Sequence, residues 1–547
     1  MRRSGQCSYS VQWKLFRTWY PGSEERKTVE IPMVDLFAGP GGLNEGFSRA
    51  SSAVTFRSAI SIEKEHWAHE TLILRAAVRS AGFPDEYYAF LNGEITEEQF
   101  RAVPEIASAL NEELARSPRL ELGEANRPEN DALIGAALSR AGIEQGSDRP
   151  WALIGGPPCQ AYSLAGRSRR THDETFAEDK KHFLYREYLH ILDTFRPPVF
   201  VMENVRGMLS SKNKDSLIFR QIKRDLELDD AYTVFSLVSD KSPEDLEPAD
   251  FLIHADQFGI PQARQRVILL GVRKDVLGRV RTVPTLVKGA HTTVRDAIGD
   301  LPTIRSSVSP RRADSDVQWS DIRQSSARIA SRHHLGTRAL PASVPPRGSV
   351  RVPRGPAHVA DPVLREWLED ENLTCVLQHE ARAHMPSDLW RYFYWARFVE
   401  LSDGREQPNV KSVPVELVPE HKNIQREDTP FTDRFWVQAW SNPSSTIVAH
   451  LAKDGHHFIH PDPMQMRSLT VREAARLQTF PDNYYFMGPR TAQYQQIGNA
   501  VPPLLARQIG EAVGRLLVGA FPTTVVPMPE EPVESATSEN ATQSDAA

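Results

Sequence analysis

The chain has 547 residues, of which 65 are Lys or Arg, 71 are Asp or Glu and only three are cysteine. At about 100–200 residues per domain, this length allows three or four domains or two large ones. Charged residues at 25% and hydrophobic residues at 40% are ordinary values for a globular protein, which excludes a wholly disordered or fibrous chain. The formal net charge of -6 gives no sign of a nucleic-acid partner and argues mildly against one.

The cysteines, Cys7, Cys159 and Cys375, are too far apart for a disulfide framework or a CxxC metal site. This spacing suits the reducing cytosol, where a cysteine acts as a thiol. The N-terminus has no apolar segment of a secretory signal, and no apolar run approaches the roughly 20 residues of a membrane span. We therefore expect a cytoplasmic protein with no membrane partner.

Residues 1–30 form a short polar and aromatic lead-in, and residues 31–302 alternate apolar runs with amphipathic stretches. This alternation predicts a doubly wound α/β sheet. The predicted elements are strands at 33–37, 151–154 and 199–202 and a helix at 183–195.

The texture changes over residues 303–450. Residues 301–360 hold ten arginines and three aspartates, and no helical or strand period persists there, which predicts a separate, irregular, basic domain. The α/β texture returns over 451–520, where Thr470 and Glu473 predict a capping box before a helix at 471–480. Residues 521–547 hold five acidic residues and no basic one, and predict a disordered acidic tail.

The first motif is DLFAGPGG at residues 35–42, a predicted strand that ends in a glycine-rich turn. Such a turn lets a ligand approach the backbone at the carboxyl edge of the sheet, and Glu63 ends the next strand, where an acid can accept ribose hydroxyls. Its glycines are spaced too closely for GxGxxG, which favours a nucleoside ligand without a pyrophosphate, such as S-adenosylmethionine, over NAD. Glycines that serve only packing explain the motif about equally well.

The second motif, GGPPCQAYS at residues 155–163, places Cys159 just beyond a buried strand, where the thiol can face a cleft. A buried, inert cysteine is the usual alternative. A hydrolase nucleophile with His182 or His254 as its base is another, although no GxCxG elbow supports it.

Two further motifs carry charge at strand ends. Glu203 follows the apolar run 199–202, and Arg264 and Arg266 precede the predicted strand 267–272. If the segment is extended, both arginines point to one face. Each motif alone is explained by a solvated strand end or a surface arginine pair.

Together, the four motifs match one reaction. A thiolate adds to C6 of a pyrimidine when a carboxylic acid protonates N3 and arginines steady the ring and the acid. C5 then attacks an activated methyl group, and loss of the C5 proton with elimination of the thiolate gives 5-methylcytosine.

The residues resemble those of the bacterial DNA (cytosine-5) methyltransferase family in six ordered blocks. The blocks are DLFAGPGG at 35–42, GGPPCQAYSLAGR at 155–167, ENVRG at 203–207, GIPQARQR at 259–266, RSLTVREAARLQTFPD at 467–482 and QIGNAVPP at 496–503. The resemblance implies a Rossmann-like methyltransferase domain over 31–302 and 451–520, with 303–450 as the target-recognition domain.

The resemblance also implies a role for individual residues. Cys159 would be the nucleophile, Glu203 would protonate N3, and Arg264 and Arg266 would contact the extruded base and the catalytic groups. The S-adenosylmethionine pocket would consist of Phe37, Gly39, Gly41, Gly42, Leu43, Glu63, Glu94, Ile95, Pro158, Leu184, Asn499 and Val501.

The chain departs from the family pattern in three places. Glu94 stands where the family usually has an aspartate, and Lys64 stands where some relatives have an aromatic residue. Residues 97–148 are longer than the usual connection, and nine acids against four arginines over 97–131 predict a surface helical excursion.

Within the target-recognition region, the arginine excess suits phosphate contacts with double-stranded DNA. The aromatic residues between 390 and 398 could stack on bases, but such a cluster is more often the core of a small domain. The spacing of His379-Glu380 and His384 would place the histidines on different faces of a helix, so we expect no metal site.

We therefore expect a monomeric, nucleoid-associated enzyme that methylates C5 of cytosine in a specific duplex sequence. A cognate restriction endonuclease encoded nearby would be its partner. A catalytically silent DNA-binding protein or a tRNA cytosine-5 methyltransferase remains an alternative. An amino-methyltransferase is disfavoured, because Cys159 stands where its aromatic residue would follow Pro-Pro.

Overall fold

The computed structural model describes most of the chain. The described residues are 29–51, 53–144, 146–158, 182–209, 215–310, 314–336, 339–341, 343–420 and 433–522. Cys7, Cys159, the lead-in and nearly all of the predicted tail lie outside them.

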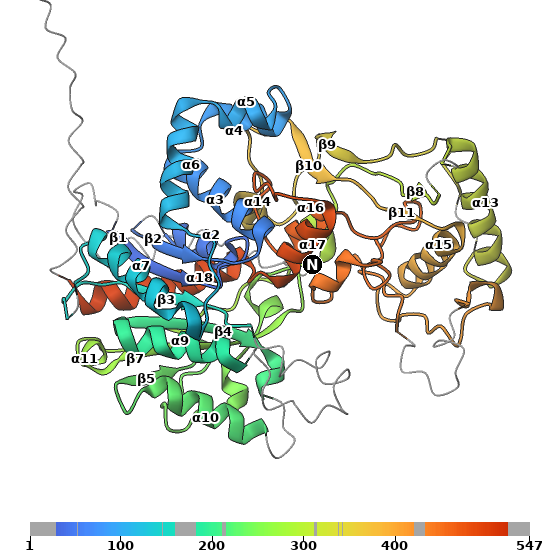
Figure 1. Cartoon of the computed structure of the whole chain (residues 1–547). Helices are drawn as coiled ribbons and strands as arrows, with labels where there is room; N and C mark the ends of the chain where they lie inside the picture. Colours follow the sequence, from blue (N-terminus) through green and yellow to red (C-terminus); the bar gives the residue numbers. More distant parts are fainter. Residues whose placement is uncertain are drawn as a thin grey trace, which may run out of the picture.

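A seven-stranded sheet forms the centre of the molecule (Figure 1). Its strands run in the order β2-β1-β3-β4-β7-β5, with β6 also paired to β7. Their bounds are β1 (Val29–Leu36), β2 (Val54–Ile62), β3 (Ala152–Gly155), β4 (Val199–Val205), β5 (Tyr232–Phe235), β6 (Leu252–His254) and β7 (Gln265–Arg273). The predicted α/β fold class is confirmed, although the sheet is mixed, because β7 is antiparallel to β4, β5 and β6.

Helices cover both faces of the sheet, because alternate strand residues point to opposite sides. Ile31 and Met33 of β1 join the hydrophobic cluster that contains α2 (Gly42–Ser48) and α18 (Pro503–Ala520). Val34 and Leu36 join the other cluster. That second cluster contains α7 (Arg127–Arg140), α9 (His182–Phe195) and α10 (Asp215–Glu227).

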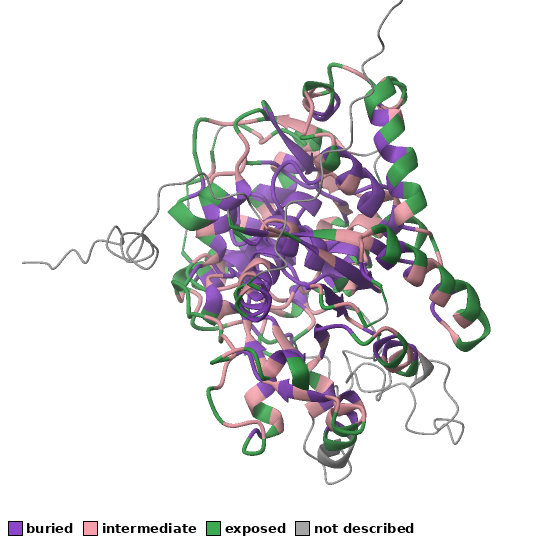
Figure 2. Ribbon diagram, turned by 90° about the vertical axis from the view of Figure 1, so that its left-hand side faces the viewer, coloured by how far each residue is buried: buried purple, intermediate pink, exposed green. Residues whose placement is uncertain are grey.

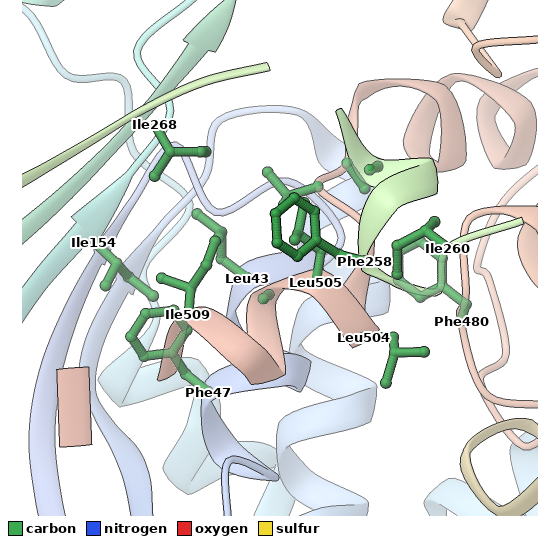
Figure 3. Close-up of a cluster of buried hydrophobic side chains, with 14 of the residues drawn as sticks. Leu43, Phe47, Ile154, Phe258, Ile260, Ile268, Phe480, Leu504, Leu505 and Ile509 are labelled. Atoms are coloured by element: carbon green, nitrogen blue, oxygen red, sulfur yellow. The ribbon is translucent and has the colours of Figure 1, made fainter. Parts of the chain in front are cut away.

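The first cluster joins segments far apart in the sequence (Figure 3). Side chains from α2, β3, β7 and α18 meet there, and the buried residues concentrate around the sheet (Figure 2). The C-terminal helix α18 therefore completes the fold that β1 and α2 begin.

The contact between α2 and α18 depends on Gly46. A Cβ atom at Gly46 would overlap the backbone of Pro503 and Arg507. We expect Gly46→Ala to lower the free energy of unfolding by about 1–3 kcal/mol, since the helices must move apart. Urea denaturation measures this change. Gly123→Ala is the control, because its Cβ would meet nothing within 4 Å, and equal stability of the two variants would contradict the packing argument.

The connection between β2 and β3 is longer than a crossover needs. It contains α3 (His66–Ser80), α4 (Asp85–Asn92), α5 (Glu97–Arg101) and α6 (Pro104–Arg116), followed by α7. The prediction of a surface excursion over 97–148 is wrong for α7, because Ile134, Ala137 and Leu138 are buried against the sheet. Their i, i+3, i+4 spacing makes α7 the crossover helix in spite of its charged neighbours.

Residues 303–450 are more regular than predicted. They contain β8 (Ser307–Val308), α13 (Asp316–Arg332), β9 (Ser349–Pro353), α14 (Pro362–Leu368), β10 (Cys375–His379), β11 (Ala383–His384) and α15 (Pro386–Leu401). Side chains of α13 and α15 form a separate core with the 435–439 segment, and Tyr392 and Trp395 are fully buried in it. The interpretation of the aromatic cluster as a domain core is confirmed.

This region is also not fully separate from the sheet domain. Trp367 of α14 belongs to the cluster of α2 and α18, and Leu377 of β10 packs with α3, α4 and α6. The prediction of one separate irregular domain is therefore wrong for residues 359–377, which pack against the α/β domain. Apolar residues at irregular spacing carried no period that could reveal this.

The C-terminal part contains α16 (Val471–Leu477) and α17 (Arg490–Asn499), and α11 (Lys274–Leu277) and α12 (Val294–Ile298) follow β7. The predicted capping box is present, since the Thr470 side chain accepts from the Glu473 N–H and the Glu473 side chain accepts from the Thr470 N–H. Among the helices of the described segments, none is long and apolar enough to cross a membrane.

Candidate active site

The turn between β1 and α2 combines two functions of glycine. Gly39 has a φ of 58°, and a Cβ there would meet nothing within 4 Å, so the backbone borders open space. Gly41 and Gly42 serve packing instead, because a Cβ would lie 3.0 Å from the Tyr484 hydroxyl and 2.5 Å from the Val501 carbonyl oxygen, respectively. The packing explanation therefore holds for Gly41 and Gly42, whereas Gly39 leaves space for a ligand.

Two carboxylates lie beside this turn. Glu63 is buried at the end of β2, and its two oxygens accept hydrogen bonds from the Gly39 and Glu65 amides, each at 2.7 Å. Each oxygen keeps a lone pair for a further donor. Asp35, which the sequence did not single out, is fully buried without a hydrogen-bond partner for either oxygen, and burial raises its pKa to about 8.

The other predicted pocket residues of this motif differ in position. Phe37 is half-buried, with a positive φ of 55°, and packs beside the cluster of α7 and α9. Leu43 points into the cluster of α2 and α18, so the prediction that its side chain lines the cofactor pocket is not supported (Figure 3).

The structure does not bring Glu94 and Ile95 to the end of β2. Both follow α4, and Ile95 packs with α3, α4 and α6. The segment beside the end of β2 is instead 119–122. The backbone of Arg119 forms an isolated parallel β-bridge with Glu63, and the Glu121 carboxylate pairs with Lys64 at 3.1 Å. In the sequence, Glu121-Leu122 has the same pattern as Glu94-Ile95, an acid followed by an aliphatic residue, and could have indicated this segment. The long helical connection places it farther along the chain than we expected.

The C-terminal motif folds back onto the first. Asn499 ends α17, and the backbone of Val501 lies against the turn at Gly42. The Tyr484 hydroxyl also donates to the Pro40 carbonyl. These contacts bring residues more than 400 positions apart to one sheet edge.

Glu203 and Arg266 form an ion pair at the same end of the sheet. The Arg266 Nε lies 2.6 Å from the Glu203 Oε1, and both side chains are largely buried. Since Glu203 and Val205 of β4 face Ile268 and Arg266 of β7, the two charged residues are diagonal neighbours across an antiparallel pair. A short, charge-assisted contact of this kind fixes the carboxylate.

Arg264 does not share the partner of Arg266. It is 1% exposed, and its guanidinium donates to the carbonyls of Ile447 at 2.9 Å and Gly498 at 3.2 Å. Its described hydrogen bonds all go to backbone carbonyls, so the contact of Arg264 with the extruded base and catalytic groups stays a prediction. The residue lies just before β7 rather than within it, so the assumed strand alternation does not apply.

Gly156 lies directly beside the carboxylate of Glu203. A Cβ at Gly156 would be 2.6 Å from the Glu203 Oε2. We expect Gly156→Ala to displace that carboxylate and to lower kcat by about 10-fold or more, while the melting temperature changes little, because only a flexible side-chain end must move. Methyl incorporation and thermal unfolding measure the two effects. A variant with wild-type kcat would contradict this positioning.

Three predicted residues lie at or beyond the edge of the described segment. Cys159 is outside it, so its surroundings are not described, and the same holds for the side chain of His182. Pro158 is exposed, and Leu184, near the start of α9, is half-buried. His254 lies on β6, with its ring 3.4 Å from the Gln265 amide nitrogen.

The arginines of the predicted recognition region, residues 303–450, are only partly accessible to a polyanion. Arg305 and Arg323 are buried, and Arg305 pairs with Asp314 at 2.8 Å. Arg328 and Arg332 are exposed. The composition of this stretch therefore overstates the number of arginines that can contact phosphates.

The histidines considered for a metal lie on strands rather than on a helix. His379 of β10 is held by Thr470 and by the Pro302 carbonyl, and burial lowers its pKa to about 4. His384 lies on β11. In the part of the chain that the structure describes, no group of three or more His, Cys, Asp and Glu side chains is arranged to hold a metal.

The sheet, the open glycine turn beside Glu63 and the Glu203–Arg266 pair define a Rossmann-like fold with its candidate active site at one sheet edge. A family model described as C-5 cytosine-specific DNA methylase matches residues 144–515. The chain belongs to this family and is a DNA (cytosine-5) methyltransferase.

Individual relatives extend this match over most of the chain. A Type II methyltransferase of Bacillus paralicheniformis, M.Bpa9945I, is 33% identical over 89% of this chain and 99% of its own length. M.DdeI of Desulfomicrobium norvegicum is 27% identical over 88% of both chains. The fold is similar to a crystal structure from Escherichia coli titled as a candidate prophage DNA modification methyltransferase, with a TM-score of 0.50, 18% identity and 89% and 99% coverage.

Proposed function

We propose that this enzyme transfers a methyl group from S-adenosylmethionine to C5 of cytosine within a specific double-stranded DNA sequence. The observation that carries the proposal is the buried Glu203–Arg266 pair beside Gly156, three residues before Cys159. An acid held by an arginine next to a thiol is the set of groups that activates a pyrimidine ring.

The residues of the sheet edge fit S-adenosylmethionine. The open space at Gly39 admits a ligand close to the backbone, and the free lone pairs of Glu63 can accept ribose hydroxyls. Phe37, Asn499 and Val501 border the same turn and would complete the pocket. When bound, the cofactor supplies an electrophilic methyl group.

The chain's own groups would perform the remaining chemistry. The Cys159 thiolate forms a bond to C6 while Glu203 gives a proton to N3, so the ring stays neutral and C5 becomes nucleophilic. Arg266 keeps the Glu203 carboxyl group in place through the ion pair. After methylation of C5, a base removes the C5 proton and the thiolate leaves C6, while N3 returns its proton to Glu203, which restores the aromatic ring.

The substrate must leave the double helix to reach this edge. Flipping a base costs a few kcal/mol, which contacts with the protein offset. The exposed arginines of α13 would bind phosphates, and the core of α13 and α15 would support loops that contact base edges. Two of the relatives are named Type II methyltransferases, which supports a Type II role. A partner endonuclease encoded nearby and action at the nucleoid are further parts of the proposal.

One experiment tests activity and target together. The full chain is expressed in a host without cytosine methylation, and the host DNA is read by bisulfite sequencing. We expect protected cytosines at one recurrent sequence. Complete conversion of all cytosines, with the protein present and folded, would overturn the proposal.

A further inference from the structure

The segment 261–264, which leads into β7, is the junction of three distant stretches of chain. The Ala263 amide donates to the Ser444 carbonyl at 2.8 Å, and the Ser444 amide donates to the Pro261 carbonyl at 3.0 Å. These bonds fasten the segment to the end of the recognition region. Its side chains reach the other two stretches.

Gln262 is fully buried and is connected to the C-terminal loop by hydrogen bonds through Gln478. Its amide nitrogen donates to the Gln478 Oε1 at 2.7 Å, and its oxygen accepts from the Ile447 amide at 2.9 Å. Gln478 is also fully buried and donates to the carbonyls of Ile497 at 2.6 Å and Ala500 at 3.0 Å.

Arg264 binds the Gly498 carbonyl, which lies between the Ile497 and Ala500 carbonyls in the chain. One of its nitrogens donates to Gly498 and another to Ile447. Gln478 and Arg264 together bind the carbonyls of residues 497, 498 and 500, and Gln262 holds Gln478. These carbonyls enclose Asn499 and precede Val501, the two pocket residues of the C-terminal loop.

The close packing of the loop leaves it few other ways to stay in place. A Cβ at Gly498 would overlap the backbone of Val448 and Ala449, so α17 ends directly on that segment. On the other side, the Val501 carbonyl lies against Gly42. A small shift of the loop would therefore move Asn499 and Val501 relative to the glycine-rich turn.

We propose that Arg264 is a positioning residue for the cofactor loop, acting with Gln262 and Gln478 through the carbonyls on either side of Asn499. The inference rests on the proposed use of S-adenosylmethionine. It gives Arg264 a role different from that of Arg266, which acts on the catalytic acid. A planar guanidinium binds two carbonyls at fixed angles, which a lysine ammonium cannot reproduce.

The test is calorimetric binding of S-adenosylmethionine to the full chain. We expect Arg264→Lys to weaken binding about 10-fold, the net effect of losing about one hydrogen bond from a charged donor. In steady-state kinetics, KM for S-adenosylmethionine should rise more than kcat falls. Arg266→Lys should show the opposite, with a lower kcat and an unchanged dissociation constant.

Arg323→Lys is the matched control. Arg323 is likewise buried, donates to the two carbonyls of Ser343 and Pro341, and has an unpaired Nε, but it lies in α13. We expect it to lower the melting temperature as Arg264→Lys does and to leave cofactor affinity unchanged. Equal cofactor affinity of Arg264→Lys and the wild type would overturn the inference.

Two further outcomes are distinguishable. If Arg264→Lys does not fold, Gln478→Met tests the same loop, since it removes both bonds to residues 497 and 500 while keeping the side-chain length. Wild-type affinity in a folded Gln478→Met variant would then overturn the inference. If the wild-type chain itself does not bind S-adenosylmethionine, the proposed function fails first.

Discussion

Replacing Cys159 by alanine is expected to lower methyl transfer to DNA by on the order of 10⁴-fold or more, because no other group can form the bond to C6. DNA binding should persist, since the recognition region is untouched. Incorporation of radiolabelled methyl groups measures the first effect, and fluorescence anisotropy of a labelled duplex measures the second.

Cys375→Ala is the control for the loss of a thiol. Cys375 lies in β10 and is buried. Its Sγ lies 3.6 Å from the Leu91 carbonyl oxygen, among residues that pack α4 against β10. We expect this variant to retain methyl transfer. Near-normal activity of Cys159→Ala would refute the covalent mechanism, whatever the result for Cys375.

Glu203→Gln is expected to reduce kcat by about 10²–10⁴-fold, since an amide cannot deliver a proton to N3. The amide has the same shape as the carboxyl group and keeps a partly negative oxygen beside Arg266, so the fold and cofactor binding should remain. Single-turnover methylation and calorimetric binding of S-adenosylmethionine measure the two properties.

Glu511→Gln provides a matched change of an acid that is paired with an arginine. Glu511 lies on α18 and accepts from the Arg507 Nε at 3.1 Å, within a solvent-facing turn. It should leave the single-turnover rate unchanged. A Glu203→Gln rate close to that of Glu511→Gln would mean that another group protonates N3.

Local patterns were sufficient where function depends on residues close in sequence. The first strand, predicted at 33–37, overlaps β1, which runs from Val29 to Leu36, and the capping box of Thr470 and Glu473 forms as expected. Glu203 was predicted at a strand end, and it lies near the end of β4. The apolar runs and turn residues encode these features directly.

Reasoning from local patterns failed in the long connection between β2 and β3. Glu94 was assigned by its local resemblance to a short motif, but two helices, α5 and α6, separate it from the segment that lies beside Glu63. Spacing along the chain carries little information about distance once a connection contains its own packed helices. The buried face of α7 was missed for a related reason, since the acidic composition of residues 97–131 extends into the start of the helix.

The sequence by itself determined the fold class and the family and placed Glu63 and Glu203 at strand ends, because each of these features is written in a short run of residues. Only the tertiary structure decided which partner each group has. Arg264 and Arg266 are two residues apart, yet one binds the carbonyls of residues 447 and 498 and the other binds Glu203. Such partners come from segments up to 234 residues away, and long-range packing, rather than local spacing, brings them together.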